Sequence, residues 1–142
     1  VARQLVKHKF LRWNEISRRY VDDEPEFYVP DQWRGRSADK KQGSDGVVNT
    51  DYNPQYLDGR IKSAYLQAID MGVAPEQARM LLPQSTMTEF YWSGSLDAFA
   101  SMCVLRLKDD TQYETRLVAQ QIDEVMSGLF PVSWKALVHD EA

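Results

Sequence analysis

The order of the predicted secondary-structure segments limits the fold of this sequence more than any other feature. Strand-like segments at 5–10, 26–30 and 88–92 are mixed with segments of helical periodicity that begin after residue 52, and residues 14–17 resemble a turn. The segments do not follow the regular strand–helix–strand order that builds a parallel sheet. The sequence therefore predicts an α+β fold in which an antiparallel sheet is flanked by helices. A chain of 142 residues has the size of a single domain.

The two central helices are predicted from their boundary residues. The first begins at Asn53-Pro54 and ends at Gly72, because Asn followed by Pro favours a helix start and Gly favours a helix end. A short helix over 75–81 must stop before Pro83. The buried stripe of the first of these helices is predicted to consist of Leu57, Ile61, Ala64, Tyr65 and Ala68.

Two further helices are predicted near the end of the chain. Ser95 is expected to cap the first, and Asp97 in its opening turn suits the helix dipole. Thr111 and Glu114 have the spacing of a capping box for the second. The apolar positions of that last helix are Val118, Ile122, Val125 and Leu129.

A polar tract covers residues 34–50. It consists mostly of Gly, Ser, Asp, Lys and other polar residues, with almost nothing to bury. Such a composition predicts a mobile surface loop within the one domain, and not a linker between two domains.

Composition and charge argue against several classes of protein. Cys103 is the only cysteine, which rules out an internal disulfide and fits the cytoplasm. No apolar run approaches the ~18 residues of a membrane span. The net charge of -4 argues against a general binder of nucleic acid. No signal-peptide pattern is visible at the start of the sequence. Because Val1 is not an initiator Met, we expect a fragment or trimmed chain.

Positive charge is concentrated near the start of the chain, where an anion could bind. A strand over 5–10 would place the Lys7 and Lys9 side chains on one face, and a following turn could bring Ser17 near them. The alternative is a solvated basic face that the acidic run after it balances. Six of the 17 Lys and Arg residues fall within the first twenty positions: Arg3, Lys7, Lys9, Arg12, Arg18 and Arg19.

Two isolated arginines are further candidates. Arg106 continues the apolar stripe of its helix, three and four residues after Cys103 and Met102. A guanidinium turned inward needs an anionic or carbonyl partner, although a position near a helix C-terminus explains an arginine equally well. Arg79 lies just before a proline stop, where a surface arginine is the more usual interpretation.

Several chemistries find no support in the residues. The chain has two histidines and one cysteine, too few for a Cys/His zinc site. It has no GxGxxG or Walker-type glycine loop. A Ser-His-Asp hydrolase would have to pair Ser17 with His8, but no nucleophile-elbow sequence surrounds this serine.

The stretch 2–20 resembles the hallmark region of flavin-dependent thymidylate synthases, the ThyX family. That family carries Arg-His-Arg, seven residues and then Ser, in a pattern that ends Asn-Glu-x-Ser-x-Arg-Tyr. Here the motif is Lys7-His8-Lys9, seven residues and Ser17, with lysines in place of both arginines. The resemblance continues at 26–30, 78–83, 90–92, 105–106 and 112–114.

The resemblance implies a single ThyX-type domain over 1–142 that lacks the family's N-terminal segment. It implies an FAD-dependent methyltransferase that converts dUMP to dTMP, with methylenetetrahydrofolate as carbon donor and NADPH as reductant. It also implies a homotetramer whose subunits share their sites, with no membrane or nucleic-acid partner expected.

Site residues follow from the same resemblance. Arg106 matches the catalytic arginine that polarises the uracil ring. The positions that match dUMP contacts are Gln4, Lys7, Glu15, Ser17, Arg18, Arg19, Arg79 and Arg106. Those assigned to FAD are Lys7, His8, Lys9, Glu15, Ser95 and Ser101. No metal site is expected.

Two alternatives stay open. One is a catalytically incomplete fragment that binds dUMP or flavin without turnover. The other is a small nucleic-acid-binding domain that uses the basic segment, which predicts an affinity that falls steeply with salt.

Overall fold

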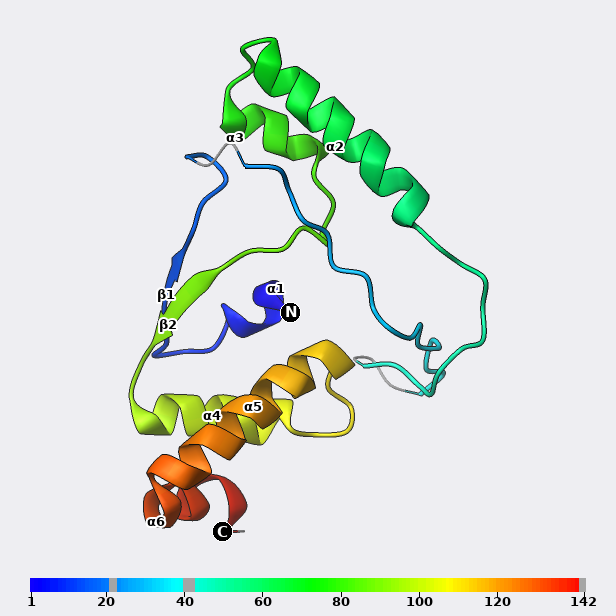
Figure 1. The fold of residues 1–142 in the computed structure, drawn as a ribbon. Coiled ribbons are helices and arrows are strands. Elements are labelled where there is room, and N and C mark those ends of the chain that lie inside the picture. Colours follow the sequence, from blue (N-terminus) through cyan, green and yellow to red (C-terminus); the bar gives the residue numbers. More distant parts are fainter. Residues whose placement is uncertain (21–22, 40–42, 141–142) are drawn as a thin grey trace. The chain divides into compact units, whose positions relative to one another are not determined.

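The computed structural model describes residues 1–20, 23–39 and 43–140, and it confirms the α+β class (Figure 1). No helix in this part of the chain is long and apolar enough to cross a membrane. In chain order the elements are α1 (Ala2–Leu5), β1 (Arg12–Glu15), α2 (Gln55–Asp70), α3 (Pro75–Ala78), the 3-10 helix η1 (Arg79–Leu81), β2 (Phe90–Ser93), α4 (Leu96–Arg106), α5 (Tyr113–Leu129), α6 (Pro131–Trp134) and the π-helix η2 (Lys135–His139).

The chain divides into two compact units. Unit 1 consists of Val1–Trp13, Arg34–Val48 and Trp92–Ala142, and unit 2 of Asn14–Trp33 and Asn49–Tyr91. Unit 1 therefore holds α1 and helices α4 to α6, whereas α2, α3 and η1 belong to unit 2. The single domain over 1–142 stays a prediction.

The core of unit 1 forms between α1, α4, α5 and α6. Small residues on α4 let the helices approach closely, and the rings of Trp92 and Phe99 pack edge-to-face with their centroids 5.3 Å apart. The indole Nε1 of the fully buried Trp134 donates to Asp123 Oδ1 at 2.7 Å. The buried residues of this core are Leu5, Ala100, Met102, Cys103, Ala119 and Trp134.

Strands β1 and β2 form a two-stranded antiparallel sheet. The strand expected over 5–10 is wrong, because the chain is helical up to Leu5 and then turns. Leu5 is buried in the core, whereas Phe10 is 82% exposed and has a φ of 65°, so the alternation does not line a sheet. The turn expected at 14–17 is also wrong in part, since β1 runs to Glu15.

The strand expected over 26–30 is reduced to a single antiparallel bridge between Phe27 and Thr86. Pro25 and Pro30 flank this segment, and proline has no N–H to extend a ladder. The strand expected over 88–92 is confirmed with slightly later bounds, as β2.

The two central helices are confirmed. The Asn53 side chain accepts a hydrogen bond from the Gln55 N–H at 2.9 Å at the start of α2, and Gly72 has a φ of 81° after its end. Of the expected stripe, only Tyr65 is fully buried, and Leu57 is 38% exposed. Unit 2 covers α2 with few elements, so part of an amphipathic face stays on the surface.

The expected capping box at the start of α5 is wrong. Gln112 is the N-cap residue, and its side chain makes no capping hydrogen bond. Thr111 Oγ1 donates to the carbonyl of Leu105 at 3.2 Å, which ties the α4–α5 turn together. Two of the expected apolar positions of α5, Val125 and Leu129, are 58% and 65% exposed.

The described part of the polar tract is irregular, as expected, apart from a bridge between Arg34 and Val47. The Arg34 guanidinium lies over the Tyr113 ring at 4.9 Å, and its Nε donates to Ser44 Oγ at 2.7 Å. Gly43 adopts a φ of 88° beside the backbone of Asp110. Residues 40–42 lie outside the described residues, and the mobility of the loop stays a prediction.

Candidate functional site

Three of the predicted site residues meet in unit 1, around Arg106. This arginine ends α4, and its Nε donates to His8 Nε2 at 2.9 Å while its Nη2 donates to the Gln4 carbonyl at 3.3 Å. Burial of Leu5 fixes α1 against the core. Gln4 and His8, which lie just before and after Leu5 in the sequence, are thereby placed within reach of Arg106. Of the anionic or carbonyl partner expected for an inward-turned Arg106, the structure shows the carbonyl of Gln4.

His8 accepts the hydrogen bond from Arg106 as a neutral ring. Burial lowers the pKa of His8 below 6.5, and the positive charge of Arg106 lowers it further. An Nε2 acceptor requires the ring proton on Nδ1. The neutral imidazole therefore orients the guanidinium and places no second positive charge beside it.

The Gln4 side chain belongs to the same cluster. Its Nε2 donates to Gln112 Oε1 at 2.8 Å, and Gln112 Nε2 donates in turn to Glu114 Oε2 at 2.9 Å. Gln4 Oε1 is buried and has no hydrogen-bond partner among the described residues. A buried acceptor without a partner is unusual and marks a place where a ligand could donate.

Apart from the half-buried His8, the predicted flavin contacts of unit 1 have exposed side chains. Lys7 and Lys9 follow α1, and no carboxylate in the described part of the chain is within ion-pair distance of either. Ser95 is the N-cap residue of α4 but makes no side-chain capping bond, and Ser101 lies on the exposed surface of the same helix.

Unit 2 holds a second set of predicted residues. Glu15 at the end of β1 accepts a hydrogen bond from Thr88 Oγ1 at 2.7 Å. Ser17 Oγ accepts from Arg19 Nε at 3.1 Å, so these two predicted dUMP contacts are neighbours.

The two other arginines of this set bind backbone carbonyls. Arg18 donates to the carbonyls of Asp23 and Glu24, at 2.5 Å and 3.5 Å. Arg79 is exposed at the start of η1 and donates to the Glu76 carbonyl at 3.4 Å. Within unit 2, neither guanidinium forms an ion pair with a described residue.

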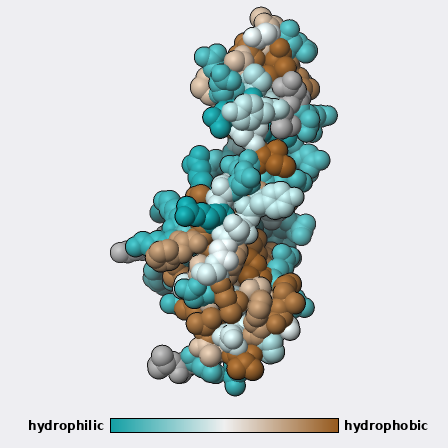
Figure 2. Space-filling model, turned by 90° about the vertical axis from the view of Figure 1, so that its left-hand side faces the viewer, coloured by the Kyte–Doolittle hydropathy of each residue, from teal (hydrophilic) through white to brown (hydrophobic). Residues whose placement is uncertain are grey.

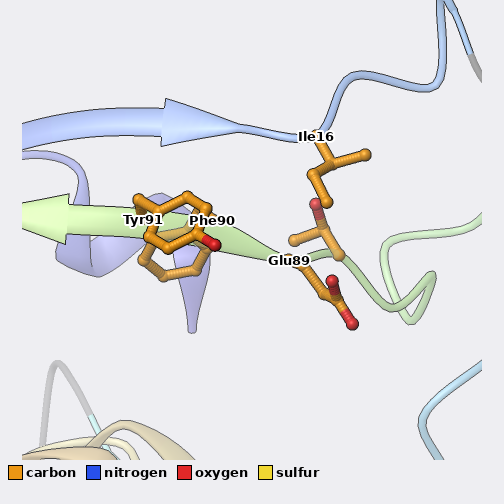
Figure 3. Close-up of a pocket in the computed structure, with 5 residues that line it drawn as sticks. Ile16, Glu89, Phe90 and Tyr91 are labelled. Atoms are coloured by element: carbon orange, nitrogen blue, oxygen red, sulfur yellow. The ribbon is translucent and has the colours of Figure 1, made fainter.

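A pocket of about 450 Å³ opens in unit 2 at the β1–β2 edge (Figure 3). None of the predicted site residues lines it, although Glu15 directly precedes Ile16 in the sequence. Its lining residues are Ile16, Thr88, Glu89, Phe90 and Tyr91. The aromatic run 90–92 is part of the family resemblance and could have pointed to this pocket. The resemblance assigned no role to its residues, however.

Neither a metal centre nor a nucleophilic thiol is present in the described part of the chain. No group of three His, Cys, Asp or Glu side chains there could hold a metal ion. Burial, and next the charge of Asp123, raises the pKa of Cys103 to about 12. The thiolate is therefore scarce at neutral pH.

Comparison with known proteins identifies the family. The family described as thymidylate synthase complementing protein (Thy1) matches residues 1–132. The chain belongs to this family. The resemblance to flavin-dependent thymidylate synthases that the motif indicated is thus confirmed.

Curated relatives of this Thy1 chain are named flavin-dependent thymidylate synthase. One from Thermus thermophilus is 36% identical over 139 residues, which is 96% of this chain and 52% of the relative. One from Kosmotoga olearia is 32% identical over 145 residues, which is 98% of this chain and 63% of the relative. The chain thus spans about half to just under two thirds of the length of these relatives.

A solved structure also matches nearly the whole chain. The UMP/dUMP methylase PolB from Streptomyces cacaoi, bound with 5-Br UMP, matches with a TM-score of 0.84 and 27% identity. The match covers 98% of this Thy1 chain and 71% of the PolB chain.

Proposed function

We propose that this Thy1 protein is an FAD-dependent methyltransferase that converts dUMP to dTMP, with methylenetetrahydrofolate as carbon donor and NADPH as reductant. The observation that carries the proposal is the Arg106 cluster. A permanently charged guanidinium, oriented by a neutral His8, donates to the main-chain carbonyl of Gln4, whose side-chain Oε1 is buried and has no partner among the described residues. Family membership and the names of the relatives support the same reaction.

Arg106 would act on the uracil ring. Its remaining N–H groups have no hydrogen-bond partner among the described residues, so they are available to a ligand. A positioned cation stabilises negative charge that develops on the ring carbonyls during methyl transfer. Gln4 would hold the ring in register through its free oxygen, and His8 would keep the guanidinium in place.

The flavin would be held by residues with exposed, cationic or hydroxyl groups. Lys7 and Lys9 offer ammonium groups that suit a diphosphate and that form no ion pair with a described residue, and Ser95 and Ser101 offer hydroxyl donors. These donors fit an anionic dinucleotide, although Asp97 adds one negative charge nearby in the sequence. When bound, FAD supplies the hydride that reduces the transferred one-carbon group, and NADPH supplies its electrons.

Residues of unit 2 complete the assignment. The resemblance gives dUMP contacts to Glu15, Ser17, Arg18, Arg19 and Arg79. Their hydroxyl and guanidinium groups are of the kind that binds a monophosphate. The subunits are proposed to assemble as a homotetramer with shared sites.

The test is turnover by the purified protein. NADPH oxidation would be followed with methylenetetrahydrofolate and either dUMP or UMP, since the solved relative is named for both nucleotides. We expect dUMP-dependent oxidation, with dTMP as the product on chromatography. If dUMP supports neither oxidation nor dTMP formation, the proposal is refuted.

A binding-only protein is the second candidate, because the chain spans only part of the length of its relatives. It predicts dUMP or flavin binding without dTMP formation. Titration with dUMP by calorimetry, run beside the turnover assay, separates the two.

A further inference from the structure

A chain of side-chain hydrogen bonds in unit 1 has a fixed direction. Gln4 Nε2 donates to Gln112 Oε1, and Gln112 Nε2 donates to Glu114 Oε2. A carboxylate can only accept, so Glu114 selects the NH2 group of Gln112. The Gln112 oxygen then selects the NH2 group of Gln4. One carboxylate thus decides the orientation of two amides.

The position of Glu114 in the fold suits a carboxylate in this role. It lies in the first turn of α5, where the helix dipole favours a negative charge. It is also partly buried, and its partner Gln112 is the N-cap residue of the same helix. The acceptor end of the chain is therefore anchored in regular structure.

The other end of the chain is the free oxygen of Gln4. Because Nε2 points toward Gln112 and donates to it, the acceptor that Gln4 can offer to a ligand is Oε1, which is buried and has no partner among the described residues. Arg106 donates to the main-chain carbonyl of the same residue at 3.3 Å. Gln4 thus offers an acceptor oxygen and is in contact with a cationic donor. A ligand that carries an N–H next to a carbonyl would use both groups.

We propose that Glu114, acting through Gln112, is a positioning residue that makes Gln4 an acceptor toward the pyrimidine and thereby favours uracil over cytosine. The inference rests on the proposed function. Uracil carries an N3–H donor between two carbonyls, which suits a residue that offers an acceptor oxygen and is itself in contact with a guanidinium. Cytosine carries an N3 lone pair, which would face the lone pairs of Gln4 Oε1.

Rotating the amides does not relieve this conflict. If Gln4 turned its NH2 group toward cytosine, its oxygen would face the oxygen of Gln112. If Gln112 also turned, its oxygen would face the carboxylate of Glu114. Each arrangement leaves two acceptors opposed, and such a buried mismatch is strongly unfavourable.

The test replaces the carboxylate by its isosteric amide. Glu114→Gln can donate or accept, so the chain is free to reverse. Dissociation constants for dUMP and dCMP would be measured by calorimetry on the full protein. We expect the wild type to prefer dUMP, and Glu114→Gln to reduce that preference by about tenfold or more, mainly by tightening dCMP binding. A merely structural role would weaken both nucleotides equally.

Two further variants complete the design. Glu124→Gln is the matched control, because it removes the same charge from an exposed residue of α5 that has no partner among the described residues. It should leave the preference for dUMP over dCMP unchanged. Gln112→Met breaks the chain at its middle and should also reduce the preference, which covers the case in which Glu114→Gln does not fold.

The outcomes separate the inference from the function on which it rests. If the wild type binds dUMP but does not prefer it to dCMP, the inference is overturned and the proposed function stands. The same follows if the preference survives in Glu114→Gln, or in Gln112→Met where Glu114→Gln does not fold. If the wild type does not bind dUMP, both are overturned.

Discussion

The contact between Arg106 and His8 couples a candidate catalytic cation to a titratable group. The folded protein holds the pKa of His8 below its ordinary value, through burial and then the charge of Arg106. The unfolded chain therefore binds a proton more readily than the folded one below about pH 6.5. The stabilising contribution of His8 is complete above that pH and is lost as the pH falls through the folded pKa.

We accordingly expect the free energy of unfolding to fall on acidification through this window. His8→Gln keeps an acceptor near the position of Nε2 but does not titrate, so it should flatten this part of the pH profile. Urea unfolding at a series of pH values measures the difference between the two proteins. His139→Gln is the control for the other histidine, and identical profiles for wild type and His8→Gln would contradict the assignment.

Arg106 itself provides a second residue-scale prediction. Lysine keeps the charge but cannot supply the forked donors that reach His8 and the Gln4 carbonyl together. Arg106→Lys should therefore fold normally and lose roughly 100-fold in the rate of dTMP formation. Arg60→Lys, at an exposed position of α2, is the matched control and should retain full activity.

At the scale of elements, the polar tract is held at Gly43. A Cβ built on this glycine would lie 2.5 Å from the Asp110 carbonyl oxygen in the α4–α5 turn, and the φ of 88° disfavours other residues. Gly43→Ala should lower the free energy of unfolding by about 1–3 kcal/mol. Gly46→Ala, in the same tract with open space around it, should change it little.

Urea denaturation of both glycine variants checks this prediction. Equal stabilities would mean that the tract is not held on the α4–α5 turn. The sequence predicted an irregular tract correctly, but the contact with Asp110 joins positions far apart in the chain. Local composition carries no information about such a contact.

The helices were more predictable than the strands for a related reason. Helix α2 is set by local signals, Asn53 before its start and Gly72 after its end, and both lie where they were expected. Strand β1 depends on a partner, β2, more than seventy residues away. The alternation over 5–10 suggested a strand, but burial of Leu5 in the helical core decided otherwise.

At the scale of the whole molecule, the apolar surface supports the proposed assembly. Figure 2 shows hydrophobic side chains gathered over the part that holds α4, α5 and α6. Leu129 and Val132 are 65% and 83% exposed in this region, and such exposed apolar patches are typical of interfaces. We expect a homotetramer by light scattering, and a monomer at micromolar concentration would contradict this.

Flavin binding is tested on the same preparation. We expect the purified protein to show the visible absorbance of a bound flavin. Replacing Lys7 and Lys9 together by Ala should weaken FAD binding about tenfold or more, because two charge-assisted contacts are lost. Lys108→Ala, which removes a charge from an exposed position after α4, should leave the affinity unchanged.

The sequence by itself determined the family, the α+β class and the bounds of the two central helices, because motifs, caps and helical periodicity are local properties of the chain. It also named Arg106, Gln4 and His8 as separate candidates. Only the tertiary structure decided that these three meet, that Gln112 and Glu114 orient Gln4, and that the strand begins at Arg12. The contacts of Arg106 with His8 and Gln4, and of Gln4 with Gln112, join positions about a hundred residues apart, and packing of the hydrophobic core selects them.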